Sequence, residues 1–200
     1  MNVFTLLSFF HFTYSEKSTH VSCTDRELVE ASLRGDTESF ETLVLRYENR
    51  VFRFLLRKHS SADTQDITQE TFLQAWTGLK SYDSRWEFST WLFTIAYRAS
   101  AGFFRQKRRD VMRDASRDEE VLGRIPQPEN GSAEETQISV KNIWDTAREV
   151  LPEPQMTAMW LFYVEEKSVR EIAHIMGRTE VSVKMLLFRG RKKLQRSVRR

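Results

Sequence analysis

Residues 168–196 read SVREIAHIMGRTEVSVKMLLFRGRKKLQR, and this stretch decides the fold of the C-terminal part of the chain. Ser168 and Glu171 are spaced as a capping box, which predicts the start of a short helix. Gly177 supplies a turn, and Thr179 can cap a longer helix that runs to about Arg196. The longer helix has one narrow apolar stripe, formed by Val183, Leu187, Gly190 and Leu194.

A short capped helix, a glycine turn and a longer basic helix make a helix-turn-helix, and a second helix of this size fits the major groove of DNA. From residue 181 to the C-terminus there are eight basic residues and no acidic one. Lys184 and Arg189 can reach phosphates or guanine edges, and their apolar neighbours can contact a thymine methyl group. The candidate contacts to duplex DNA are Thr179, Ser182, Lys184, Met185, Phe188, Arg189 and Lys192. The alternative is a solvated basic helix that only ends a helical bundle.

The rest of the chain also favours helices, because its seven Gly and four Pro leave long stretches free of both. No segment shows the alternation of apolar and polar residues that is typical of a strand, so we predict an all-α fold. One buried stripe steps by three and four through Phe40, Leu43, Val44, Tyr47, Val51, Phe54 and Leu55. Further helices are predicted over 25–35, from a cap at Asp63 to Trp76, and over 89–105, 138–150 and 155–164.

Residues 110–137 separate two small helical domains, 24–109 and 138–200. Residues 110–140 carry three basic and eight acidic side chains, with Pro and Gly in the middle, so we predict a flexible acidic linker there. Residues 1–23 are an N-terminal extension that we expect to be disordered, with a partner-binding helix as the alternative. Its apolar run is too short to span a bilayer and lacks the features of a signal peptide. We expect no stable membrane insertion.

A second group of residues has the composition of a single-stranded DNA site, in which bases stack on aromatic rings and phosphates meet cations. Its aromatic members are Tyr82, Trp86 and Phe88, before or at the start of a predicted helix. Its basic members are Arg98, Arg105, Lys107, Arg108 and Arg109. Trp91 lies in the same stretch, but on a helix it is more often a core residue than a stacking platform.

Asp66, Gln69 and Glu70 share one face of a predicted helix, because residues three and four apart are neighbours there. As metal ligands of a nuclease they lack a third carboxylate and a catalytic His, so a polar protein-docking face is the simpler interpretation. The single Cys23 excludes an internal disulfide, and no Cys or His group has the spacing of metal ligands. We expect no enzyme activity, no cofactor and no metal.

The chain resembles the extracytoplasmic-function (ECF) group of sigma factors, compact two-domain members of the sigma-70 family. The resemblance covers about residues 25–109 and 150–196. In the first domain it rests on residues 35–47, on the run DITQETFLQAW at 66–76 and on FSTWLFTIA at 88–96. In the second it rests on Leu151-Pro152, on residues 171–177, and on Val183-Lys184 and FRGRKKL at 188–194.

The resemblance implies a factor that binds core RNA polymerase, directs it to promoters and promotes DNA melting in the cytoplasm. Asp66, Gln69 and Glu70 would dock on the clamp helices of the largest polymerase subunit, and the second domain would contact the flap of the second-largest. The loop from Lys80 to Phe88, with the helix after it, would capture bases of the minus-ten element. The last helix would bind the minus-thirty-five element, and an anti-sigma factor would hold such a protein inactive.

Three residues depart from the family pattern. Arg98 stands where Asn is usual, so the minus-ten preference is expected to be unusual. Leu186 stands where Arg is common, which removes a possible DNA contact. Gly190 replaces a usual Ala, at an expected cost to the isolated helix of roughly 0.5–1 kcal/mol.

Two other function classes remain open at this point. A stand-alone helix-turn-helix regulator would explain residues 155–200 and would bind duplex DNA without polymerase. A DNA-processing enzyme using Asp66 and Glu70 would cleave DNA in the presence of a divalent metal. Neither explains an acidic connector between two basic modules.

Overall fold

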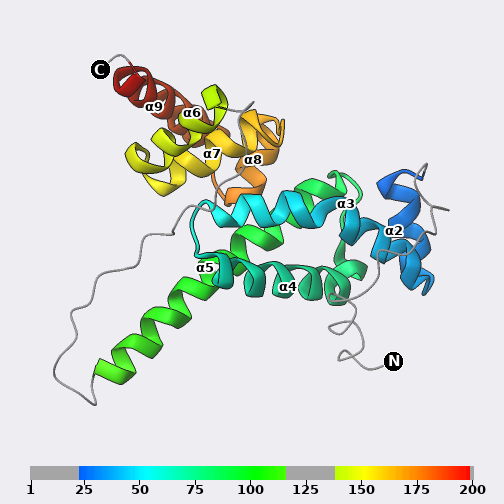
Figure 1. Cartoon of the computed structure of the whole chain (residues 1–200). Coiled ribbons are helices and arrows are strands. Elements are labelled where there is room, and N and C mark those ends of the chain that lie inside the picture. The colour runs from blue at the N-terminus through cyan, green and yellow to red at the C-terminus, as the bar shows by residue number, and fades with distance from the viewer. Residues whose placement is uncertain (1–22, 116–137, 199–200) are drawn as a thin grey trace.

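The computed structural model describes residues 23–115 and 138–198, and every regular element in these two ranges is a helix. The all-α prediction is therefore confirmed for the described residues. The predictions made for residues 1–22 and 116–137 lie outside them. Figure 1 shows two helical groups, one from α2 to α5 and one from α6 to α9, with α8 of the second group lying next to the first.

The first group contains the helices α2 (Asp25–Leu33), α3 (Thr37–Leu56), α4 (Ser61–Gly78) and α5 (Phe88–Ala115), and the 3-10 turn η1 (Leu79–Ser81). Thr24 forms a capping box with Glu27 at the start of α2, and the Asp36 side chain caps α3. The predicted cap at Asp63 is wrong. Ser60 caps α4 instead, because its side chain accepts a hydrogen bond from the backbone N–H of Asp63. Asp63 lies in the first turn, where the negative charge of an acidic side chain interacts favourably with the helix dipole.

The core of the first group forms where the apolar stripe of α3 meets α4 and α5. Phe54 packs edge-on against Phe93 of α5, with ring centroids 5.1 Å apart, and Phe40 packs against Trp76 of α4 at 4.8 Å. Tyr47 of the same stripe reaches Phe88 at 5.5 Å. Helix α3 thus holds α5 along much of its N-terminal half.

Helix α5 continues to Ala115, past the predicted domain boundary at residue 109. Residues 106–115 contain neither Gly nor Pro, and most of them are good helix formers. A high charge density made this segment resemble a linker, but charge alone does not end a solvated helix. The first six residues of the predicted linker are therefore helical.

The second group contains α6 (Ile138–Val150), α7 (Glu153–Tyr163), α8 (Val169–Met176) and α9 (Glu180–Val198). Helix α7 begins at Glu153, earlier than predicted, because Pro154 lies in its first turn, where proline is tolerated. Ser168 and Glu171 form the predicted capping box of α8, and Gly177 ends that helix with φ +59°. Helices α8 and α9 together form the predicted helix-turn-helix.

Gly190 lies where α9 crosses α7. A Cβ atom at this position would lie 3.1 Å from Cγ and 3.3 Å from Sδ of Met159. The glycine therefore permits the close approach of the two helices, which offsets its unfavourable helix propensity. No helix within the described residues has the length and apolar character needed to cross a membrane.

Candidate nucleic-acid interface

Helix α9 buries its narrow stripe and exposes the rest. Val183 and Leu187 are 0% and 3% exposed, whereas Met185 and Phe188 are 45% and 56% exposed. The predicted contacts Thr179, Lys184, Arg189 and Lys192 are also exposed, and Ser182 is half-buried. Thr179 accepts a hydrogen bond from the backbone N–H of Ser182, so it caps the helix as predicted.

The exposed side of α9 combines cations with apolar groups. The Lys192 ammonium lies 6.0 Å from the ring centroid of Phe188. Val181, which is not among the predicted contacts, is 73% exposed at the start of the same side. Leu186 is half-buried and packs against the core, so in this chain position 186 serves packing. A surface of this kind can approach phosphates and thymine methyl groups together.

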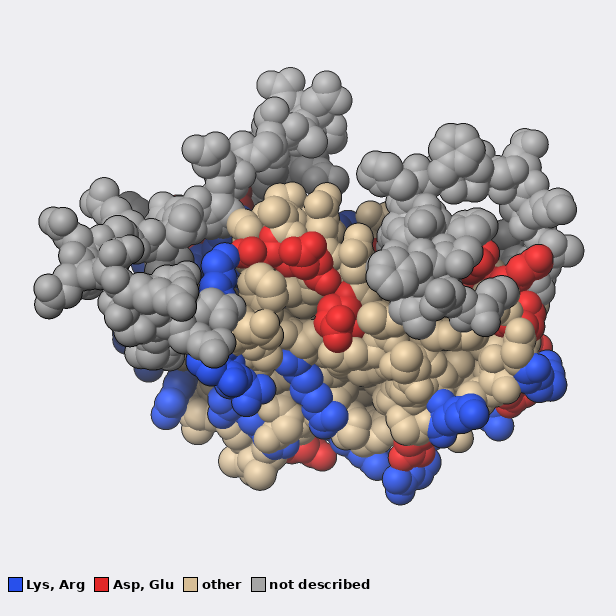
Figure 2. Space-filling model, turned by 90° about the horizontal axis from the view of Figure 1, so that it is seen from below, with Lys and Arg blue, Asp and Glu red and all other residues tan. Residues whose placement is uncertain are grey.

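Asp66, Gln69 and Glu70 are exposed on α4. Ile67, Phe72 and Ala75 of the same helix are buried, so the three polar residues lie on its outer side. The Gln74 side-chain amide donates a hydrogen bond to Glu70 at 2.6 Å. Figure 2 looks onto the molecule from below, the side on which α4 lies in Figure 1, and shows acidic and basic groups on an otherwise uncharged surface.

The predicted single-strand residues do not form one patch. Arg105 lies seventeen residues after Phe88 on the same helix, a separation of about 25 Å at 1.5 Å per residue. Lys107 forms an ion pair with Asp63 at 2.9 Å, while Arg105 and Arg109 are exposed and the side chain of Arg108 lies outside the described ones. The basic end of α5 and the aromatic residues at its start are therefore separate surfaces.

Phe88 is 2% exposed and belongs to the core, so its ring is not accessible to a base in this conformation. Tyr82 packs edge-on against Phe88 and Trp91, and its hydroxyl donates a hydrogen bond to the carbonyl of Trp86 at 2.7 Å. These contacts hold the loop before α5 in place. Lys80 at the start of this loop is exposed.

Trp86 lies in the loop before α5, and its ring contacts the second helical group instead of the first. It stacks on His174 of α8, with ring centroids 4.3 Å apart and an interplanar angle of 18°. The guanidinium carbon of Arg170, one turn earlier on α8, lies 5.2 Å from the Trp86 ring centroid. Burial, and then the nearby charge of Arg98, lowers the pKa of His174 below its usual range. The predicted single-strand residue Trp86 thus lies against α8, while Arg98 is exposed on α5.

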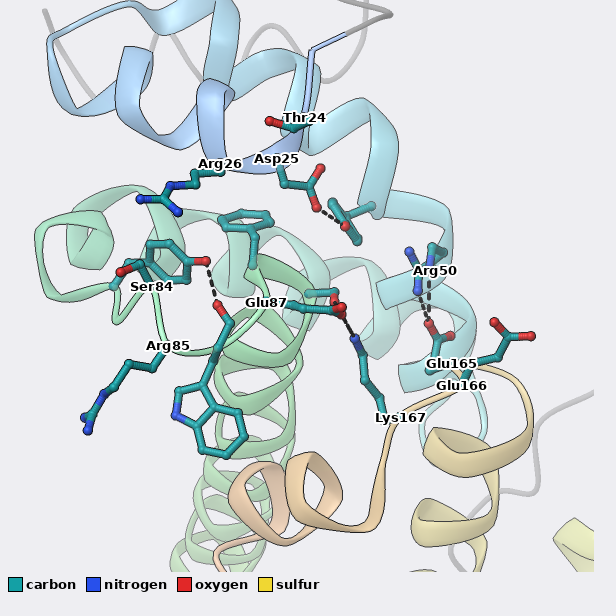
Figure 3. A pocket seen from close by; sticks show the side chains of 15 residues that line it. Thr24, Asp25, Arg26, Arg50, Ser84, Arg85, Glu87, Glu165, Glu166 and Lys167 are labelled. Carbon is teal, nitrogen blue, oxygen red and sulfur yellow. Dashed lines mark hydrogen bonds and ion pairs between the residues drawn. The ribbon is translucent and has the colours of Figure 1, made fainter.

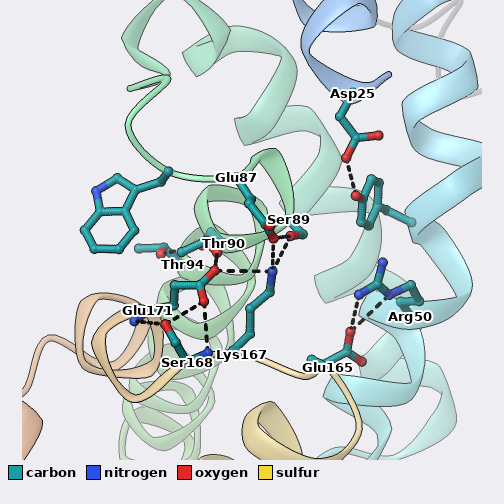
Figure 4. Close-up of polar contacts among 12 residues, drawn as sticks. Asp25, Arg50, Glu87, Ser89, Thr90, Thr94, Glu165, Lys167, Ser168 and Glu171 are labelled. Atoms are coloured by element: carbon teal, nitrogen blue, oxygen red, sulfur yellow. Dashed lines mark hydrogen bonds and ion pairs between the residues drawn. The ribbon is translucent and has the colours of Figure 1, made fainter. Parts of the chain in front are cut away.

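A buried lysine joins the two groups close to Trp86. Lys167 precedes α8, and its side chain is 4% exposed. Its ammonium donates hydrogen bonds to the carboxylate of Glu87 at 2.6 Å and to the hydroxyl of Ser89 at 2.5 Å, both at the start of α5 (Figure 4). Glu171 of α8 lies 3.5 Å from the same ammonium and accepts a hydrogen bond from Thr90 at 2.6 Å.

A buried glutamate makes a second contact of the same kind. The Glu165 side chain is 3% exposed and accepts two hydrogen bonds from the Arg50 guanidinium of α3, at 2.8 and 3.0 Å. Between the two buried charges, Glu166 has φ +54°, a left-handed conformation that is uncommon outside glycine. This turn directs Glu165 and Lys167 toward the first group (Figure 3).

Arg57, at the end of α3, contacts both groups. Its guanidinium carbon lies 4.4 Å from the ring centroid of Phe54 and 5.3 Å from that of Trp160 on α7. The neighbouring Lys58 lies 3.5 Å from the Glu153 carboxylate. The contact between the groups is therefore continuous from the end of α3 to the start of α5.

A cavity of about 680 Å³ opens beside the two buried charges. Charged side chains of both signs line it, among them Asp25, Arg50, Glu87, Glu165 and Lys167 (Figure 3). Most of these charges are already paired with one another. Across the described residues, no three His, Cys, Asp or Glu side chains are grouped so as to hold a metal ion.

The residues that join the two groups are not among the predicted site residues. Glu171 is predicted as part of a capping box, and it does accept hydrogen bonds from the Ser168 backbone N–H and hydroxyl. Its other oxygen contacts Thr90, 81 residues away. Glu165 and Lys167 carried no periodic or motif signal that could have identified them.

Comparison with known proteins gives two family matches. Residues 43–110 match the model of sigma-70 region 2, and residues 141–194 match that of sigma-70 region 4. An ECF RNA polymerase sigma-E factor of Haemophilus influenzae is 31% identical, over 88% of this chain and 95% of the relative. The protein of the same name from Escherichia coli K12 is 33% identical, over 88% of this chain and 94% of the relative.

Two solved structures share the fold. One is CnrH in complex with the cytosolic domain of CnrY, with a TM-score of 0.60 and 21% identity, covering 87% of this chain and 96% of the other. The second is the sigma factor RpoE in complex with the anti-sigma factor NepR from Bartonella quintana. Its TM-score is 0.61 at 21% identity, and the match covers 81% of this chain and 98% of the other.

The Glu171 carboxylate predicts a pH dependence of stability. Burial alone would raise its pKa, but hydrogen bonds from Thr90 and Ser168 and the charge of Lys167 lower the pKa to about 2. Because the folded pKa lies below that of the unfolded chain, the stabilisation is fully present above about pH 4.5 and is lost as the pH falls toward 2. Urea unfolding of the Glu171→Gln variant should show a weaker loss of stability between about pH 5 and about pH 3 than wild type. Glu149→Gln, at an exposed position on α6, is the matched control, and equal slopes for wild type and Glu171→Gln would contradict the assignment.

Proposed function

Because the chain belongs to the ECF sigma factors of bacterial RNA polymerase, we propose that it binds core polymerase, directs it to specific promoters and promotes melting of their DNA. In this proposal residues 24–109 are the region 2 domain and residues 138–200 the region 4 domain. Such a protein acts in the cytoplasm and performs no catalysis of its own. An anti-sigma partner is part of the proposal, since two structurally similar chains were solved in complexes of that kind or with a partner's cytosolic domain.

The exposed side of α9 is the observation that carries the proposal. Its basic residues Lys184 and Arg189 flank two apolar side chains, Met185 and Phe188, that are about half exposed. Apolar side chains in water are not stabilised, whereas thymine methyl groups in a major groove can cover them and remove that surface from water. We assign this side of α9 to the minus-thirty-five element.

The polar side of α4 is assigned to docking. Asp66, Gln69 and Glu70 are exposed and close together, while the opposite side of α4 is fixed in the core. We propose that they bind the clamp helices of the largest polymerase subunit and that the second domain contacts the flap of the second-largest. Both contacts would set the distance between the two DNA-binding domains.

Melting is assigned to the start of α5 and the loop before it. Stacking contributes about 1–3 kcal/mol per captured base, comparable to the few kcal/mol needed to unstack a base step. One or two captured bases can therefore decide the balance without nucleotide hydrolysis. Trp86 is the candidate platform, since Phe88 is buried and Tyr82 and Trp91 pack on it.

The docking assignment predicts that reversing both charges weakens holoenzyme formation. The variant Asp66→Lys/Glu70→Lys should bind core polymerase roughly tenfold more weakly or worse, because two acidic partners of the clamp are replaced by repulsive ones. Competition with a labelled sigma factor for core polymerase measures this. Glu30→Lys/Glu149→Lys is the control, since it changes the net charge equally at exposed sites on α2 and α6. Undiminished binding of the first variant would refute the docking face.

The assignment of α9 predicts a change in salt dependence. The promoter is first selected by run-off transcription from a genomic library. If Lys184 and Arg189 contact phosphates, replacing either by Ala should lower the slope of log affinity against log salt concentration of the holoenzyme by about one. If either contacts a base, its loss should cost about 1–3 kcal/mol and relax the preference at one position. Arg34→Ala, an exposed residue at the end of α2, should do neither. No change in affinity, slope or preference for both α9 variants would remove the assignment.

The melting assignment predicts that Trp86→Ala separates promoter binding from promoter opening. With core polymerase, the variant should form closed complexes normally, while permanganate reactivity of thymines around the minus-ten element falls. Trp91→Ala is the comparison, because Trp91 contacts Tyr82 and Phe88 and its loss should first lower thermal stability. Full thymine reactivity with Trp86→Ala would show that base capture occurs elsewhere, with Arg98 the next candidate.

A further inference from the structure

The C-terminal half of α5 carries a basic stripe on the side that faces away from the core. Arg98, Arg105 and Arg109 are exposed. With Gly102 they lie within about 60° of one another around the helix axis, because each residue turns the helix by about 100°. Lys107 lies on the opposite side, where it pairs with α4. Within the described residues none of the three arginines forms an ion pair, and Figure 1 shows this end of α5 extending beyond its neighbours.

Neither packing nor backbone conformation requires a glycine at position 102 within the described residues. A Cβ atom on Gly102 would meet no atom within 4 Å, whereas on Gly190 it would lie 3.1 Å from Met159. Gly102 also lacks the positive φ of Gly35 and Gly177. Glycine in a helix interior lowers helix stability relative to alanine. A ligand that approaches the helix backbone closely would offset this cost.

We propose that the stripe of Arg98, Gly102, Arg105 and Arg109 is a track for the sugar-phosphate backbone of duplex promoter DNA. The arginines hold phosphates, and the missing side chain at Gly102 lets one strand approach the helix. The inference rests on the proposed function, in which the minus-thirty-five element is bound as duplex and only bases of the minus-ten element are melted. Duplex DNA therefore lies between the two elements, and the track gives it a contact on the first domain. Arg98 lies at the end of the track that is nearest to the melted bases.

The spacing of the charges fits one strand of the duplex. Arg105 and Arg109 are about 6 Å apart along the helix axis, and successive phosphates of a strand advance about 3.4 Å along the duplex axis. The two guanidinium groups can therefore bind phosphates one or two nucleotides apart by charge-assisted hydrogen bonds. Ala99 and Ala101 flank Gly102 and are half-buried, so the strand meets only small side chains beside the glycine.

The track suits duplex DNA better than a single strand. Single strands are bound largely by exposed aromatic rings on which the bases stack. Between residues 98 and 109 the only aromatic residues are Phe103 and Phe104, and both contact His59 on the other side of the helix, with ring centroids 5.8 and 4.7 Å apart. Without stacking, the contacts reach only the backbone and the bases can stay paired. Such contacts carry no sequence information, but they fix the position of the duplex.

Promoter binding by the holoenzyme tests the charges. Arg105→Ala/Arg109→Ala should weaken binding to a duplex fragment of the selected promoter about tenfold or more. It should lower the slope of log affinity against log salt concentration by about two, one for each lost phosphate contact. Arg34→Ala/Arg53→Ala is the matched control, because it removes the same charge from exposed positions outside α5. A single-stranded oligonucleotide with the minus-ten sequence of the same promoter should bind wild type and both variants alike.

Gly102 is tested by two measurements that should move in opposite directions. Gly102→Ala should raise the Tm of the free chain by about 1–4 °C, because alanine favours the helix and its methyl group meets open space. The same variant should lower the duplex affinity of the holoenzyme severalfold, because the methyl group keeps the strand away. Gly102→Leu should lower that affinity further without lowering the Tm. In the Arg105→Ala/Arg109→Ala background Gly102→Leu should cost less affinity than in wild type, since the strand no longer follows the track.

Several results would overturn the track. An unchanged salt slope for the arginine variant would remove the phosphate contacts, and an unchanged duplex affinity or a lower Tm for Gly102→Ala would give the glycine another role. Equal losses of single-stranded and duplex binding would assign the stripe to the melted strand. Weaker binding of the arginine variant to core polymerase, in competition with a labelled sigma factor, would assign it to a protein contact. The proposed function fails separately, if the wild-type holoenzyme selects no promoter.

Discussion

The buried ammonium group of Lys167 is the contact on which the arrangement of the two domains depends. Removing a lysine from water is tolerated only where acceptors replace its hydration, and Glu87, Ser89 and Glu171 do so only while the start of α5 faces α8. Glu165, two residues earlier, has the same requirement toward Arg50. Because the Glu166 turn fixes these two side chains relative to each other, both contacts form together or not at all. The pair therefore specifies a single closed arrangement, although each ion pair contributes little net stability.

This constraint gives neighbouring aromatic residues different tasks. Phe88 lies in the core and, with Tyr82 and Trp91, anchors the loop before α5. Trp86 is directed away from that core, which leaves its ring available to a partner. In this structure the partner is His174, with the Arg170 guanidinium close by. Imidazole and guanidinium groups both bind the face of an indole.

The exposed side of helix α9 takes no part in this contact. Its core stripe packs on α7 and α8, with Gly190 allowing close approach to Met159, and the side that we propose contacts DNA remains exposed.

The sequence by itself determined the helices, most of their caps and the side of α9 that stays free, because these follow from local spacing. Periodicity shows which face of a helix is apolar, and a capping box needs only residues three apart. It could not show that Phe88 is core while Trp86 is covered, since both are aromatic and stand two residues apart. Nor could it pair Arg50 with Glu165 or Lys167 with Glu87, which lie 115 and 80 residues apart in the chain. Those contacts depend on which surfaces lose water together when the domains meet, and only the tertiary structure decides that.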